Sequence, residues 1–250
     1  MGLNRNSIAF YYGQGELIRL AAFDRVVLQP GHFGSEDLAW LRQRGTLTLA
    51  YLSLGQDAGE PMPWHTDLDN PEWGTRFVDV ANPAWIARCV AAVRANLAAG
   101  FAGVFLDTLD RPLDTESENA KMLSLVRSVR EAAGSAYLLA NRGFSLFPEL
   151  AGLVQGMVFE SFSTTWTLDD LYCTVLPRDV LEHNSRVANA LASFDIERYA
   201  LDYAYSRQQL SFARARARLH GMSWSASNRS LTMLPDSLAL GNQTATSLDA

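Results

Sequence analysis

The sequence predicts a single α/β domain, a (β/α)8 TIM barrel. Short apolar runs alternate with longer stretches of helical periodicity, which is the pattern of successive βαβ units in a parallel sheet. Eight such units fit into 250 residues, about the usual size of an eight-stranded barrel. The first apolar run is not followed by a GxGxxG sequence, which disfavours a dinucleotide-binding domain. An open doubly wound sheet is the alternative, but a closed barrel fits the number of units better.

Each predicted strand is a short run of aliphatic, β-branched or aromatic residues that is bounded by turn-forming residues. The seventh is the hardest to place, because the competing segment 188–192 continues an apolar helical stripe. The eight strands are expected at 7–12, 25–29, 47–54, 103–109, 136–141, 156–162, 198–204 and 222–227.

Helix signals fill the intervals between these strands. Ser35 is the expected N-cap of a helix over 36–44, and Asn82-Pro83 supply the cap and first turn of a helix that ends before Gly100. The chain from 236 to 250 is polar and is expected to be a poorly ordered tail after a barrel domain over 1–235. Further helices are expected at 16–22, 118–133, 146–153, 168–194 (split by Pro177) and 206–220.

One connection, 56–81, is unusually long and contains several prolines and tryptophans. We expect it to lack regular structure, and long loops of this kind are usually functional. Its Trp64 and Trp73 can line a binding groove or simply cover the barrel mouth, and Trp166 in a later loop has the same two interpretations.

The net charge of the sequence limits the classes of molecule that it can bind. The net charge of −6 disfavours nucleic acid or an anionic membrane as the main partner, since both require a concentrated basic surface. The basic segment 207–218 fits the solvated face of a helix. We expect a monomer without a membrane span. The N-terminus lacks a signal-peptide core, so the protein is either cytoplasmic or secreted after loss of a leader.

Cysteine and histidine usage indicates no metal site. Cys89 and Cys173 both fall in predicted helices and are expected to be buried free thiols. The four histidines are scattered along the chain, which counts against a metal-dependent hydrolase. No cofactor is expected.

Two carboxylates stand out by position. Asp107 follows the apolar run 104–106, and Glu160 follows 157–159. A single acid of this kind is more often a helix cap or an arginine partner, whereas two acids on alternate strands of one barrel favour an active site. Strands four and six would end about 10 Å apart, and inward side chains would reduce this to the ~5–9 Å of glycosidase carboxylate pairs. One acid must then stay protonated while the other is ionised.

Five motifs in order make the sequence recognisable. They are AYLSLG (50–55), GVFLDTLD (103–110), NRG (141–143), FESF (159–162) and ALDYA (200–204). Together they resemble the endo-α-1,4-polygalactosaminidase family of glycoside hydrolases, over about 8–234. The resemblance implies a (β/α)8 barrel that cleaves α-1,4-linked galactosamine-containing polysaccharide, often a microbial exopolysaccharide. It also implies that Asp107 and Glu160 are catalytic. Similarity to other barrel hydrolases assigns Asp107 as nucleophile and Glu160 as acid/base.

One position departs from the family pattern. Relatives commonly have Glu after the glycine of the third-strand motif, where this chain has Gln56. An amide can bond a sugar hydroxyl but carries no charge to hold an ammonium group. A carbohydrate-binding barrel of the same family with lost or redirected activity is therefore the alternative function.

The remaining candidate residues lie at or near predicted strand ends or in the following loops, and they carry aromatic rings or hydrogen-bonding groups suited to sugars. For a single aromatic ring, core packing is an equal alternative, and Asp110 with Arg142 can form an orienting ion pair. The candidate sugar contacts are Tyr11, Tyr12, Gln29, Tyr51, Gln56, Asp110, Asn141, Arg142, Trp166, Asp202 and Trp224.

Overall fold

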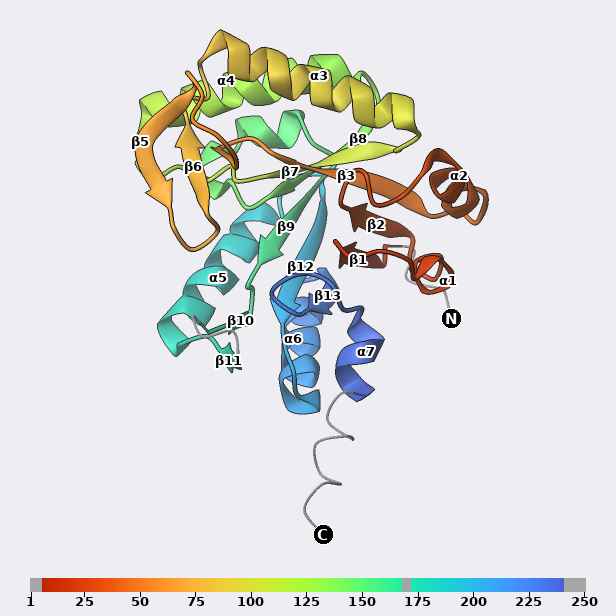
Figure 1. Cartoon of the computed structure of the whole chain (residues 1–250). Coiled ribbons are helices and arrows are strands. Elements are labelled where there is room, and N and C mark those ends of the chain that lie inside the picture. Colours follow the sequence, from red (N-terminus) through yellow and green to blue (C-terminus); the bar gives the residue numbers. More distant parts are fainter. Residues whose placement is uncertain (1–5, 168–171, 241–250) are drawn as a thin grey trace. The chain divides into compact units, whose positions relative to one another are not determined.

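The structure is a computed structural model that describes residues 6–167 and 172–240 (Figure 1). Its strands and helices alternate as in a (β/α)8 barrel, which confirms the predicted fold class. The eight strands of the main sheet are β1 (Ile8–Tyr11), β2 (Arg25–Leu28), β3 (Leu47–Ser53), β7 (Gly103–Asp107), β8 (Tyr137–Asn141), β9 (Gly156–Glu160), β12 (Glu197–Tyr203) and β13 (Ser223–Ser227).

The helices occupy the intervals between these strands. Between β8 and β9 the predicted single helix is replaced by two short 3-10 helices, η1 (Phe144–Leu146) and η2 (Glu149–Gly152). The α-helices are α1 (Leu17–Leu20), α2 (Ser35–Gln43), α3 (Pro83–Ala99), α4 (Glu116–Ala133), α5 (Arg178–Leu191), α6 (Arg207–Leu219) and α7 (Pro235–Leu240).

The chain divides into two compact units, which we call the terminal unit (Met1–Thr48 with Val158–Ala250) and the middle unit (Leu49–Met157). In the terminal unit β9 lies beside β12, β12 pairs in parallel with β13, β13 contacts β1, and β1 pairs in parallel with β2. The last strand therefore contacts the first. In the middle unit β7 pairs in parallel with both β3 and β8.

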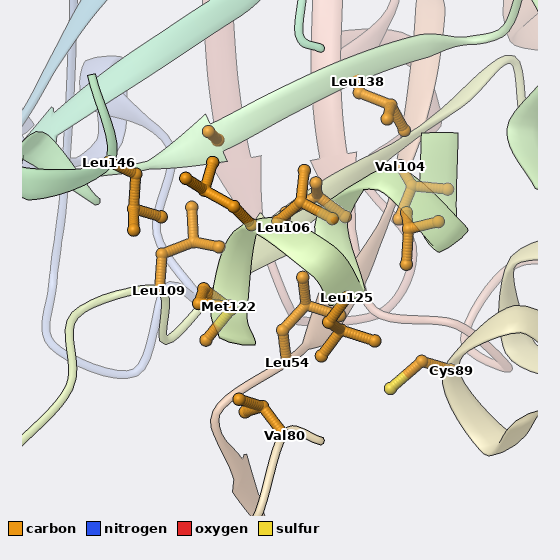
Figure 2. Packing of buried hydrophobic residues seen from close by; sticks show 14 of the residues in the cluster. Leu54, Val80, Cys89, Val104, Leu106, Leu109, Met122, Leu125, Leu138 and Leu146 are labelled. Atoms are coloured by element: carbon orange, nitrogen blue, oxygen red, sulfur yellow. The ribbon is translucent and has the colours of Figure 1, made fainter. Parts of the chain in front are cut away.

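The middle unit has a continuous apolar core between its strands and the helices α3 and α4. Leu106 of β7 and Met122 of α4 are completely buried in it, and Figure 2 shows both among their neighbours. Removing a side chain such as Leu106 from a core of this kind typically costs about 2–5 kcal/mol. The core thus fixes β7 up to its last residue, Asp107.

Helix capping follows the sequence at α3 but not at α2. The Asn82 side chain accepts the backbone N–H of Ala84 at 2.9 Å, and Gly100 closes α3 with a φ of 110°. The prediction that Ser35 caps α2 is wrong, because Ser35 is its first helical residue. Gly34 is the N-cap, and its N–H donates to the Asp37 carboxylate at 3.0 Å.

The long connection 56–81 is not the structureless loop that we predicted. It contains a three-stranded antiparallel sheet in the order β4 (Gln56–Asp57), β6 (Thr75–Val78), β5 (His65–Asn70). Its strands are short, polar and interrupted by a bulge, so they lack the apolar alternation by which a strand is recognised.

The segment 168–194 is also not helical throughout. An antiparallel pair, β10 (Thr164–Trp166) and β11 (Cys173–Val175), precedes α5, and residues 168–171 lie outside the described part of the chain. Cys173 is therefore in a strand, not in the expected helix, although it is buried as predicted, as is Cys89. Pro177 is the N-cap of α5, so the helical pattern could not extend upstream through it.

The C-terminal region is helical where the sequence suggested a tail. Residues 236–240 form most of α7, and 241–250 lie outside the described residues. Leu238 is almost fully buried, and Asp236 makes an ion pair with Arg19. These contacts hold α7 against the terminal unit.

Candidate active site

Three successive strands of the main sheet end in the same local conformation. Each finishes with a polar residue, and the next residue adopts a left-handed backbone that is costly for any residue with a Cβ. Non-glycine residues of this kind concentrate at functional sites. Only two others, Glu16 and Leu231, occur in the described part of the chain. The three pairs are Asp107-Thr108, Asn141-Arg142 and Glu160-Ser161, with φ of 59°, 56° and 53° at the second residue.

In the middle unit, Asp107 is partly buried at the end of β7 and is held by its neighbour on β8. The Asn141 side-chain N–H donates to Asp107 Oδ1 at 2.8 Å. Asn141 is itself only 6% exposed, so burial limits the movement of its amide. The structure thus brings together two of the residues singled out from the sequence.

The Thr108 side chain joins the end of β7 at Asp107 to the backbone that follows β3. Its hydroxyl oxygen accepts the N–H groups of Gly55 at 2.7 Å and Leu54 at 3.1 Å, and it donates to the Asp107 carbonyl at 2.7 Å. A Cβ at position 55 would lie 2.2 Å from the Thr108 carbonyl oxygen. The glycine that ends the AYLSLG motif is therefore required by this close approach.

Asp110 and Arg142 form the ion pair considered from the sequence. Arg142 Nε donates to Asp110 Oδ2 at 2.8 Å, and the other carboxylate oxygen accepts the Gly143 N–H at 3.1 Å. The Asp110 and Arg142 side chains are nearly half exposed. They tie the loop after β7 to the loop after β8 without being buried.

Gln56 is occupied within the fold. Its side-chain oxygen accepts from the Thr75 hydroxyl at 2.6 Å and from the Asn70 amide at 3.2 Å. It therefore anchors the small sheet β4-β6-β5, and the oxygen that we expected to bond a sugar already has two donors. Tyr51, on β3, is partly exposed and lies with its ring 6.3 Å from that of Phe105.

Trp64 and Trp73 differ sharply. Trp64 is 8% exposed, donates to Asp57 Oδ2 at 2.9 Å and lies 5.7 Å from the Trp85 ring, so it is a core residue and not a sugar subsite. Trp73 follows β5 and is half exposed. Of the two, only Trp73 has ring surface to offer a ligand.

In the terminal unit, Glu160 is partly buried at the end of β9. The Tyr203 hydroxyl donates to Glu160 Oε1 at 2.5 Å, and Tyr203 is 1% exposed. Tyr203 was not among the residues predicted from the sequence, although it lies next to Asp202 in the ALDYA motif. The available signal was the period of two along a strand, which points neighbouring side chains to opposite faces.

Asp202 is completely buried and accepts the N–H groups of Ser163 at 2.6 Å and Thr164 at 2.8 Å. Burial raises the pKa of Asp202 to about 6, against the lowering effects of these two amides, Trp224 and Arg216. We expected Asp202 to contact the substrate, but in the structure its side chain is buried and bonded to backbone N–H groups. Asp202 fixes the loop that follows Glu160.

The predicted residues at the ends of β1 and β2 have unequal exposure. Tyr11 is 5% exposed and donates its hydroxyl to the Gln14 carbonyl at 2.8 Å, so it closes the turn after β1. Burial, helped by Glu16, raises the pKa of Tyr11. Tyr12 and Gln29 are partly exposed, and the Tyr12 carbonyl lies 2.9 Å from His32 Nδ1.

Two tryptophans of the terminal unit are partly exposed. The Arg229 guanidinium lies over the Trp166 ring, with Cζ 4.2 Å from its centroid, a cation–π arrangement. Trp224 packs with Tyr205 and Met233 against the small apolar cluster that contains Leu238. Both rings are thus partly covered by protein contacts.

Among the residues that the structure describes, no three His, Cys, Asp or Glu side chains gather in a group able to hold a metal ion. Within those same ranges, no helix is both long and apolar enough to cross a bilayer.

Comparison with known proteins identifies relatives over nearly the whole chain. The model of glycoside-hydrolase family GH114 matches residues 9–240. The glycoside hydrolase domain of PelA from Pseudomonas aeruginosa is 27% identical, with a TM-score of 0.82 over 91% of this chain and 96% of that one. Aspergillus fumigatus Ega3, solved in complex with galactosamine, is 14% identical, with a TM-score of 0.70 over 90% and 91%.

A more distant solved structure shares the fold alone. The α-galactosidase TtGalA from Thermus thermophilus, in complex with p-nitrophenyl α-D-galactopyranoside, is 16% identical, with a TM-score of 0.62 over 98% of this chain and 62% of that one. Among curated proteins, none is significantly similar in sequence to this chain.

Proposed function

We propose that the chain, a glycoside hydrolase that belongs to family GH114, cleaves α-1,4-linked galactosamine-containing polysaccharide with Asp107 and Glu160 as its two catalytic acids. The observation that carries this proposal is the repeated strand-end conformation. Each acid ends a strand, precedes a left-handed residue and accepts a hydrogen bond from a buried neutral side chain. This is how a preorganised carboxyl group is held.

The proposed chemistry uses the two acids in different roles. Asp107 attacks the anomeric carbon while Glu160 gives its proton to the departing glycosidic oxygen, which leaves a glycosyl ester on Asp107. Glu160 then takes a proton from water, and the resulting attack on the anomeric carbon releases Asp107 and restores the protonated Glu160. The α-configured substrate thus yields an α-configured product.

The choice of substrate has three supports. The sequence motifs resemble the polygalactosaminidase family, and the fold relative Ega3 holds galactosamine. A chain with net charge −6 also attracts a polymer of de-N-acetylated, cationic sugars at long range. We propose the partly exposed Tyr12, Gln29, Tyr51, Arg142, Trp166 and Trp224 as sugar contacts.

The test compares release of reducing ends from acetylated and de-N-acetylated galactosamine polymers. Asp107→Asn and Glu160→Gln are each expected to lose at least about 1,000-fold in kcat, because neither amide can perform the role of the acid. Glu131→Gln, at an exposed position of α4, is the matched control and should keep wild-type activity. Activity retained in either acid variant would contradict the assignment, and binding without cleavage by wild type would favour the carbohydrate-binding alternative.

The separate roles of Asp107 and Glu160 are tested by the stereochemistry of the product. Proton NMR of the first products distinguishes an α from a β reducing end before mutarotation. An α product supports Asp107 as nucleophile, whereas a β product would make Asp107 the base that activates water.

A further inference from the structure

Three consecutive residues of β12 contact the end of β9 and the loop after it. The Leu201 carbonyl accepts the Ser161 N–H at 2.8 Å, and the Asp202 side chain accepts the N–H groups of Ser163 and Thr164. The Tyr203 hydroxyl donates to Glu160. Alternation along the strand sends the two side chains to opposite faces. Residues of β12 therefore contact both the Glu160 carboxyl group and the backbone that follows Glu160.

The same loop is held from the helical side of the terminal unit. The Asn184 amide donates to the carbonyl of Phe162 at 3.1 Å and, more weakly, to that of Ser161 at 3.3 Å. Arg216 Nε donates to the Ser163 hydroxyl at 3.2 Å. With its backbone fixed in this way, the remaining freedom of Glu160 is that of its own side chain, which the Tyr203 hydroxyl contacts.

We infer that Tyr203 is a positioning residue that fixes the Glu160 carboxyl group for proton transfer, an inference that rests on the proposed role of Glu160. A donor at Oε1 makes this oxygen the acceptor of the pair. The acidic proton of the un-ionised group then belongs on Oε2, which leaves this oxygen to deliver the proton to the leaving group. The phenol also stabilises the ionised form that must exist after the first step.

The test is Tyr203→Phe, which keeps the buried ring and removes only the donor. Because a hydrogen bond to the ionised form is lost, the alkaline limb of the kcat–pH profile should move up by about one pH unit. Loss of orientation should lower kcat by about 10- to 100-fold with KM little changed. Both quantities are measured on the polymer that the wild type cleaves.

Tyr199→Phe is the matched control. Tyr199 lies on the same strand, is also completely buried, and donates its hydroxyl to a glutamate, Glu197, at 2.7 Å. Both variants therefore lose one part-buried phenol-to-carboxylate bond from a buried tyrosine and should lose similar thermal stability. Only Tyr203→Phe should change the pH profile.

Two results would overturn the inference. The first is a wild-type pH profile and kcat in Tyr203→Phe, or changes in it no larger than in Tyr199→Phe, while Glu160→Gln is inactive. That outcome leaves the proposed function intact. The second is full activity in Glu160→Gln, which would remove the role of Glu160 and the positioning role of Tyr203 together.

Discussion

The regions around Asp107 and Glu160 both hold an acid at the end of a strand, but they use different chemical groups to do so. Both acids end a strand, precede a left-handed residue and accept one bond from a buried neutral donor, an amide at Asp107 and a phenol at Glu160. The backbone that follows is held differently. The neutral hydroxyl of Thr108 holds it at Asp107, whereas the carboxylate of Asp202 holds it at Glu160.

This difference has a consequence for pH. A hydroxyl keeps the same charge over the physiological range, so the support of Asp107 does not titrate there. The support of Glu160 is a buried acid whose pKa is raised to about 6. The contacts that support Glu160 therefore include an ionisable group, Asp202, whereas the Thr108 hydroxyl that supports Asp107 is not ionisable in this pH range.

The largest expected effect is on the pH dependence of stability in Asp202→Asn. The folded protein holds a proton on Asp202 up to about pH 6, whereas the unfolded chain releases it near the ordinary value of 3.8. The stability contributed by this group is thus fully present below about pH 4 and lost as the pH rises through 6, a change of roughly 3 kcal/mol. The asparagine oxygen still accepts both N–H groups but does not titrate.

Urea unfolding at intervals from pH 4 to pH 7 measures this difference. The free energy of unfolding of wild type, relative to that of Asp202→Asn, should fall across the interval. A constant difference would mean that Asp202 does not change its protonation there, and the contrast between the two supports would disappear.

The second effect is on catalysis and concerns the amide donor. Asn141→Ala removes the bond to Asp107 and should lower kcat by about 100-fold, the usual result of misplacing a reacting group by an ångström. Asn119→Ala is the control, since Asn119 makes an amide-to-carboxylate bond of the same length, 2.8 Å, to Asp114, which precedes α4. Equal kcat in the two variants would show that Asp107 needs no such support.

The third effect is on stability, and it is a comparison of glycine substitutions at the two left-handed residues Thr108 and Ser161. Glycine relieves the backbone cost at either position, by about 1 kcal/mol. Thr108→Gly also leaves the Gly55 N–H without its hydroxyl acceptor and removes the hydroxyl contact to Ser53, so it should destabilise by about 1–2 kcal/mol net, although the Leu54 N–H keeps the Asp107 carbonyl as an acceptor. Ser161→Gly loses only a hydroxyl contact to Thr165 and should stay within about 0.5 kcal/mol of wild type. Thermal or urea unfolding of both gives the comparison, and equal losses would contradict it.

The sequence was sufficient for the features that depend on local pattern. The main strands and the position of Asp107 and Glu160 follow from apolar runs that end in an acid, and the start of α3 follows from Asn82-Pro83. Each of these signals lies within a few neighbouring residues.

The supporting contacts could not be predicted in the same way. Tyr203 lies 43 residues from Glu160 in the chain, and the amide of Asn141 reaches Asp107 over 34 residues. The partners of Gln56 and Asp202 could not be predicted for the same reason, because they lie in a small sheet and a loop that the apolar pattern does not reveal. Sequence indicates the acids, and pairing between strands determines what holds them.

The smallest expected effect separates binding from stability at Arg142. Its ion pair with Asp110 is nearly half exposed, so Arg142→Gln should change the free energy of unfolding by less than about 0.5–1 kcal/mol. Asp110 still accepts the Gly143 N–H in this variant, which keeps the loop in place. If Arg142 contacts the sugar as proposed, KM should rise several-fold while kcat stays within about twofold. An unchanged KM would leave Arg142 as an orienting partner of Asp110, and substrate recognition in the middle unit would then rest on other side chains such as Tyr51.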